Sequence, residues 1–195
     1  MKEKTSGAPS WRTAFYAVLI YALVVLVFTL LGVLLSPLAA QVGGTRPDET
    51  IPAHVAELGL FGLLLGIMLV AIAGRSALPL VVATPIMTAL LDADHLPAYL
   101  GYAQPIRPAH SLIFLVVVLA IVATTIKALD MDLIVMSAFL GHLAIDSGQF
   151  APFSPINFSY FQLDPFNISL GVCALLCALA AGLVWRSRMA RGAGT

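Results

Sequence analysis

Long apolar runs repeat along the whole chain, and they limit what this sequence can fold into more than any other feature. Hydrophobic residues make up 60% of it and charged residues only 10%, with a mean hydropathy of +0.98. A helix needs about 20 apolar residues to cross a hydrocarbon core. Six candidate spans can be drawn, at residues 13–35, 52–73, 77–91, 110–126, 131–146 and 167–185. The sequence therefore predicts an all-α, polytopic membrane bundle of about six spans, forming a single domain over residues 1–195.

The distribution of Lys and Arg predicts how this bundle is oriented. With six spans and a cytoplasmic N-terminus, eight basic residues fall on the inner side and only Arg46 and Arg107 on the outer side. Such an excess indicates that the cytoplasm faces the basic side. Residues 1–12 and 186–195 are then cytoplasmic, the second as a short tail without helix, and Trp11 and Trp185 are expected at the inner interface. The first run is too long for a signal peptide and is expected to remain as a span.

The remaining bulk properties exclude some classes of function. The net charge is zero, so no surface for a polyanion is implied and nucleic acid is not an expected partner. Cys173 and Cys177 lie one helical turn apart inside the last apolar run, where two small packing residues are the simpler interpretation. The oligomeric state is left open by the sequence.

Polar residues gather between residues 92 and 111 and again at 141–146, in a chain that is otherwise apolar. Ionisable groups are costly near a membrane and usually have a task there. In the predicted topology, all four histidines and several carboxylates fall at the outer ends of spans or in outer loops. These residues are His54, Glu57, Asp92, Asp94, His95, His110, His142 and Asp146. A site that faces away from the cytoplasm is therefore expected.

Two of these groups have the spacing of metal ligands. His142 and Asp146 are four residues apart, so on a helix they share a face and can reach one ion; the alternative is that His142 packs and Asp146 ends the helix. Asp92 and Asp94 would repel each other unless a cation lies between them, although they and His95 could also be solvated loop residues. Imidazole and carboxylate together suit zinc or manganese.

Other polar residues have two possible roles each. Arg107 could anchor the chain at the interface or hold a phosphate in a bidentate fork. Ser111 is expected to be a hydrogen-bond partner near the site, because no nucleophile elbow surrounds it. His54 and Glu57 are three apart and share a helix face, either as part of a metal site or as a local pair at the helix end.

The order of these motifs resembles the YdjM-like family of inner-membrane, metal-dependent hydrolases. The resemblance rests on D-x-D-H at 92–95, R-x-x-H-S at 107–111 and G-H-x-x-x-D at 141–146, followed by P-F-S at 152–154. It covers residues 51 to 155. The chain departs from the family pattern in having Leu91 where a proline is usual, and in lacking one histidine and one threonine of the motif around Arg107.

The resemblance implies a membrane metallohydrolase with one or two ions, zinc first and manganese second. Its ligands would come from Asp92, Asp94, His95, His110, His142 and Asp146. Asp94 or Glu57 would act as general base and Arg107 would hold a phosphate. The expected substrate is a lipid-like phosphoester of the membrane. The alternatives are a metal-binding structural or assembly protein without catalysis and, less favoured because the inner halves of the spans carry few polar side chains, an ion transporter.

Overall fold

The computed structural model describes residues 11–39, 51–100, 107–146, 149–157 and 161–192. Helices make up nearly all of this part of the chain. They are α1 (Trp11–Ala39), α2 (Ile51–Ala73), α3 (Leu78–Leu90), α4 (Leu96–Tyr99), α5 (Leu112–Thr125), α6 (Leu129–Ile145) and α7 (Asn167–Gly192). Four 3-10 turns join them: η2 (Arg75–Ala77), η3 (Leu91–His95), η4 (Pro108–His110) and η5 (Asp164–Phe166). Two-residue strands β1 (Gln149–Phe150) and β2 (Phe161–Gln162) pair antiparallel.

The all-α prediction is confirmed, because α1, α2, α3, α5, α6 and α7 coincide with the six apolar runs. Four stretches are long and apolar enough to cross a membrane: Trp11–Leu35, Ala56–Ala73, Arg75–His95 and Asn167–Arg191. The apolar helix α5 is shorter, with 14 residues. This length and composition are those of membrane-spanning helices.

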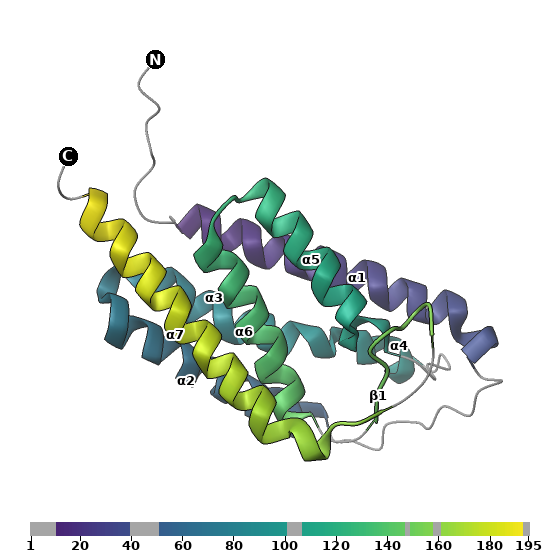
Figure 1. The fold of residues 1–195 in the computed structure, drawn as a ribbon. Helices are drawn as coiled ribbons and strands as arrows, with labels where there is room; N and C mark the ends of the chain where they lie inside the picture. Colours follow the sequence, from purple (N-terminus) through teal and green to yellow (C-terminus); the bar gives the residue numbers. More distant parts are fainter. Residues whose placement is uncertain (1–10, 40–50, 101–106, 147–148, 158–160, 193–195) are drawn as a thin grey trace.

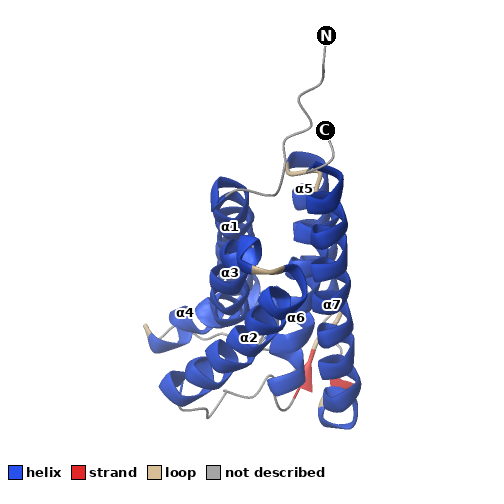
Figure 2. Cartoon of the chain, turned by 90° about the vertical axis from the view of Figure 1, so that its left-hand side faces the viewer, coloured by secondary structure: helices blue, strands red, loops and turns tan. Residues whose placement is uncertain are grey.

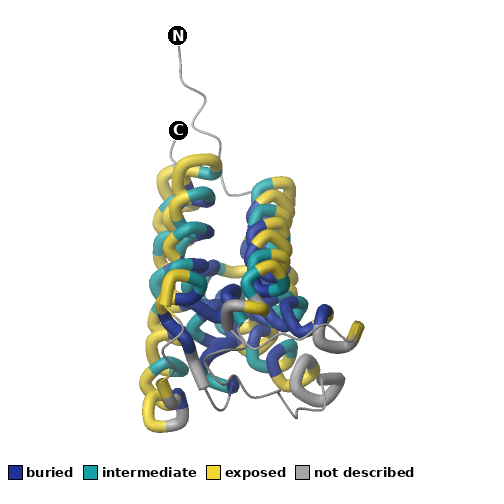
Figure 3. Tube along the Cα trace, turned by 90° about the vertical axis from the view of Figure 1, so that its right-hand side faces the viewer, coloured by how far each residue is buried: buried dark blue, intermediate teal, exposed yellow. Residues whose placement is uncertain are grey.

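The helix α6 lies at the centre of the bundle. It packs against α7, α3, α5 and α2 and touches α1, and its residues Ile134, Val135, Ala138 and Phe139 are completely buried. Both described chain ends lie at one end of the bundle, while α4 and the strand pair lie toward the other (Figures 1 and 2). Figure 3 shows that buried residues face inward and that the outer sides of the helices are exposed. Apolar residues such as Leu34 and Leu64 are found on these outer sides.

Two glycines allow α2 and α3 to pack closely. A Cβ atom on Gly62 would lie 2.5 Å from the Cα of Pro85, and one on Gly66 would lie 2.8 Å from the Cα of Val81. Small residues four apart are typical of close helix contacts in membranes. Pro85 has no N–H to give to the carbonyl of Val81, and Gly66 brings α2 against that carbonyl. This glycine pair holds in place the helix that leads into η3.

The C-terminal end of the bundle corrects two predictions. The helix α7 continues through Gly192, so most of the expected tail is helical. Trp185 is completely buried and its indole N–H donates to the Ser76 hydroxyl at 3.0 Å, so it lies inside the bundle and not on the lipid-facing surface. Arg188 forms an ion pair of 3.0 Å with the buried Asp130 of α6. These contacts favour helix past the last apolar residue.

Candidate metal centre

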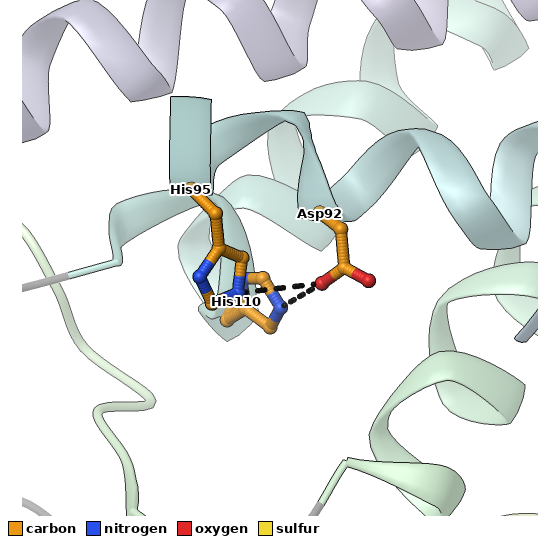
Figure 4. A group of neighbouring side chains, drawn as sticks. All are labelled: Asp92, His95 and His110. Carbon is orange, nitrogen blue, oxygen red and sulfur yellow. Dashed lines mark ion pairs between the residues drawn. The ribbon is translucent and has the colours of Figure 1, made fainter. Parts of the chain in front are cut away.

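Three segments that are far apart in the sequence meet at one place in the bundle. The turn η3 follows α3, the turn η4 precedes α5, and α6 ends beside them; α1 packs against both turns. All six predicted ligand positions are at most 5% exposed. Figure 4 shows Asp92, His95 and His110 turned toward one another. The helices therefore gather these six positions into one buried cluster.

The side chains of His110 and His142 are fixed in a way that calls for a cation. The Nδ1 of His110 lies 2.8 Å from Oδ2 of Asp94, and the Nδ1 of His142 lies 2.8 Å from the carbonyl oxygen of Thr88. Both partners are acceptors, so both Nδ1 atoms carry the hydrogen. The two Nε2 atoms lie only 2.8 Å apart and would present lone pairs to each other. Only a cation between them, a proton or a metal ion, makes that contact favourable.

Asp92 adds a carboxylate oxygen to the atoms around this contact. Its Oδ1 lies 3.5 Å from Nε2 of His142, 3.8 Å from Nε2 of His110 and 3.4 Å from Nε2 of His95. In a tetrahedral site with ligands at about 2.0–2.1 Å, neighbouring ligand atoms are roughly 3.3 Å apart. The distances from Asp92 are close to this spacing, whereas the 2.8 Å between the two histidine Nε2 atoms is shorter and equals that of a hydrogen bond.

Two overlapping groups of ligand atoms are compact enough to hold an ion. One is Asp92, His95 and His110; the other is His110, His142 and Asp146; within each group the atoms lie within 4.8 Å of one another. His110 belongs to both, so the cluster suits either one ion or two neighbouring ions. Soft sulfur ligands are absent from both groups, and this mixed nitrogen and oxygen set is compatible with zinc and with manganese.

Arg107 lies inside this cluster. It precedes η4 and is 17% exposed. One of its terminal nitrogens is 2.7 Å from Nε2 of His95 and the other is 3.2 Å from Oδ2 of Asp146. Since a guanidinium can only donate, the Nε2 of His95 is an acceptor here. Arg107 thus bridges the two groups, and its fork is turned toward the potential ligands.

The structure gives Asp94 and Asp146 different places in the cluster, although the sequence predicted both as ligands. Asp94 lies behind His110, bonded to its Nδ1, and belongs to neither group. Such a carboxylate behind a histidine typically orients the ring. Asp146 ends α6, with its backbone N–H bonded to the carbonyl of His142 at 2.9 Å, and its Oδ2 lies 3.8 Å from Nε2 of His110. The two interpretations of Asp146, helix end and potential ligand, therefore both apply.

The cluster leaves out some candidate residues. Glu57 is exposed on α2 and belongs to neither potential ligand group. The side chain of His54 lies outside the described part of the chain. Ser111 caps α5: its hydroxyl accepts from the backbone N–H of Phe114 at 3.1 Å and donates to the carbonyl of Pro108 at 2.6 Å. Its hydroxyl therefore fixes the start of α5 immediately after His110.

Sequence reasoning missed several features that support the cluster. A Cβ atom on Gly141 would lie 2.7 Å from the ring of Phe61, so a glycine beside His142 is needed for α6 to approach α2. The carbonyl of Thr88 holds the ring of His142. Neither contact has a signal in the sequence, because each joins segments more than 50 residues apart.

The cluster lies level with the middle of α1. Tyr21, whose ring packs on Phe114 at the start of α5, is ten residues from the start of α1 at 11 and eighteen from its end at 39. Ten residues of helix span about 15 Å. Phe61, which faces Gly141, is likewise near the middle of α2. The reason is that α5 and α6 are shorter than α1, with 14 and 17 residues against 29. The start of α5 and the end of α6, which carry the cluster, therefore lie beside the middle of α1.

Comparisons of the chain with protein-family models, curated proteins and solved structures find no match. The structure itself defines the class of protein: an all-α bundle with membrane-length apolar helices and a buried histidine and aspartate cluster that could hold a divalent metal ion.

Proposed function

We propose that this protein is a membrane-embedded, metal-dependent hydrolase that acts on a phosphoester of a lipid-like substrate. The observation that carries the proposal is the contact between the two Nε2 atoms of His110 and His142, with Oδ1 of Asp92 beside both. The motif order that resembles the YdjM-like hydrolases agrees with this function. Zinc is the proposed ion and manganese the second choice.

Each residue of the cluster has its own role in this proposal. Asp92, His110 and His142 would hold the ion, with His95 and Asp146 as further ligands. A divalent ion held there would polarise a phosphoester and activate a water molecule for attack on it. Asp94 keeps the ring of His110 in place through Nδ1. Arg107, which is the most exposed member of the cluster, presents two donors that suit the oxygens of a phosphate.

The surroundings of the cluster support a lipid-like substrate and an extracytoplasmic opening. The outer sides of α1 and α2 are apolar and exposed, as expected for helices in contact with lipid. Arg12, Arg75, Arg186, Arg188 and Arg191 lie at helix ends away from the cluster. If the basic end faces the cytoplasm, η3, η4 and the end of α6 point toward the opposite side.

A structural metal site is the second candidate, and the burial of the cluster favours it. Structural sites are closed by protein ligands, whereas catalytic sites keep a position open. An ion held by η3, η4 and α6 would join three segments at the centre of the bundle. This alternative predicts that removing a ligand lowers stability without removing any turnover.

Metal content is the first test. We expect the detergent-purified protein to hold zinc or manganese in stoichiometric amount, and His142→Ala and Asp146→Asn variants of matched thermal stability to hold less. Glu57→Gln is the control, because its exposed side chain lies outside the ligand groups and it should keep the metal. A wild-type protein that holds no metal after purification without chelator would overturn the proposal.

The second test separates the hydrolase from the structural site. Metal-loaded protein is screened against phospholipids, isoprenoid phosphates and a water-soluble aryl phosphate, beside an Arg107→Lys variant. We expect hydrolysis of a lipid phosphoester that falls at least roughly tenfold in Arg107→Lys while the metal content is kept, since lysine cannot reproduce the bidentate fork. A stably metal-loaded protein without turnover on any of these substrates would favour the structural role.

A further inference from the structure

The guanidinium of Arg107 is a positive charge that the chain itself places between the two potential ligand groups. Its Nη1 lies 2.7 Å from Nε2 of His95, a member of the first group. Its Nη2 lies 3.2 Å from Oδ2 of Asp146, a member of the second. Arg107 also immediately precedes η4, which carries His110, the residue that both groups share. One cation of the protein therefore contacts a member of each group directly.

The contact with His95 withdraws one donor atom from any ion. The nitrogen of His95 that lies 3.4 Å from Oδ1 of Asp92 is Nε2, and the same atom accepts from the guanidinium. A neutral imidazole has a single acceptor nitrogen, so Nε2 of His95 cannot bind an ion while Arg107 keeps this position. The atoms around the 2.8 Å contact of the two other rings come from what we call the three-ligand set: Asp92, His110 and His142.

The charges of the cluster balance with a single ion. Asp92, Asp94 and Asp146 are each at most 5% exposed, and they carry three negative charges when ionised. Buried charges are costly unless opposite charges compensate them. One divalent ion and the guanidinium of Arg107 supply three positive charges. A second divalent ion beside Arg107 would leave an excess of positive charge in a buried place.

We propose that Arg107 takes the place of a second ion and makes the cluster a centre for one ion. This inference rests on the proposed metal-dependent function and narrows it: the three-ligand set holds the ion, whereas His95 and Asp146 are held by the guanidinium. Three protein ligands with one open position are typical of catalytic zinc sites. A substitution that removes the charge of Arg107 makes His95 and Asp146 available to a second ion.

The test is the number of zinc ions per chain in Arg107→Met, with Arg107→Lys as the matched control. Detergent-purified protein is equilibrated with excess zinc, passed through a desalting column and measured by elemental analysis. We expect one ion per chain in the wild type and in Arg107→Lys, which keeps the positive charge, and two in Arg107→Met, which lacks it. One ion in an Arg107→Met variant with the thermal midpoint of the wild type would overturn the inference.

A His95→Ala variant tests the same assignment even if Arg107→Met does not fold. Because His95 serves Arg107 and not the ion, His95→Ala should keep one zinc ion per chain. Its zinc Kd should rise by less than about tenfold, the smallest usual effect of changing even a partner behind a metal ligand. His142→Ala, which removes a member of the three-ligand set, should lose the ion. Loss of zinc in His95→Ala as well would overturn the inference, since His95 would then be a ligand.

The outcomes separate this inference from the proposed function. Wild-type protein that binds two zinc ions would overturn only the role of Arg107, because centres with two ions also hydrolyse phosphoesters. Wild-type protein that binds no zinc would overturn both. Neither measurement depends on turnover, so the number of ions is decided before a substrate is known.

Discussion

At the scale of single residues, hydrogen bonds behind the histidines explain how the cluster is built. His110 and His142 each have one ring nitrogen held by an acceptor, a carboxylate in one case and a backbone carbonyl in the other. This fixes which nitrogen faces the centre. Asp94 therefore acts on an ion through His110, and removing its charge should weaken binding without removing a ligand.

We accordingly predict that Asp94→Asn lowers zinc affinity by about 10–100-fold, the usual effect of changing a partner of a ligating histidine. Competition with a chromogenic chelator measures it. Asp132→Asn is the control, since Asp132 lies in the first turn of α6, at the end opposite His142, and should bind zinc as the wild type does. Equal affinities of Asp94→Asn and wild type would show that Asp94 does not orient His110 for an ion.

At the scale of secondary-structure elements, close packing of α2 against α3 positions the site. Gly62 and Gly66 face the backbone of α3 at Pro85 and Val81, and α3 leads directly into the turn that carries Asp92 and Asp94. A side chain at either glycine must push the two helices apart. The distance between them is therefore set by the absence of two Cβ atoms.

We predict that Gly66→Ala destabilises the protein by about 1–3 kcal/mol, as expected for overpacking. Gly59→Ala on the same helix should instead stabilise it by up to about 1 kcal/mol, because a Cβ there meets no atom within 4 Å and alanine favours helix more than glycine does. Thermal midpoints in one detergent compare the two variants. The same shift for both would contradict the close contact at Gly66.

At the scale of the whole molecule, an ion would join η3, η4 and α6, and through them α3 and α5. A ligand that binds only the folded state stabilises it by about 2.7 kcal/mol at a hundredfold excess over its Kd. The rest of the bundle is held independently, for example by the Asp130 and Arg188 pair at the opposite end. The metal-free protein should therefore remain folded, with a lower thermal midpoint.

We predict that zinc at a hundredfold excess raises the midpoint of the metal-free protein by roughly 5–10 °C, from about 2–4 °C per kcal/mol for chains of this size. Melting curves with zinc and with chelator measure the shift. In His142→Ala the shift should disappear, whereas Gly59→Ala should keep it. A midpoint that zinc leaves unchanged in the wild type would contradict an ion at the centre of the bundle.

The sequence alone predicted the helices, their membrane length and the residues that lie together in the buried cluster. Apolar runs of membrane length can satisfy their backbone groups only as helices, and His95, His110, His142 and Asp92 stand out because ionisable groups are rare in such a chain. Local sequence patterns predicted the structure less well where residues contact distant parts of the chain. Most of the tail expected to lack helix is helical, because Trp185 and Arg188 have partners in the bundle.

Only the tertiary structure decided how the cluster is arranged and how deep it lies. Asp94 supports the ring of His110 and Glu57 is exposed, although nothing in their sequence spacing distinguishes these roles. The cluster lies level with the middle of α1 because the shorter α5 and α6 end there. Sequence spacing reports neighbours on one helix, whereas these features depend on which helices pack together and at what height.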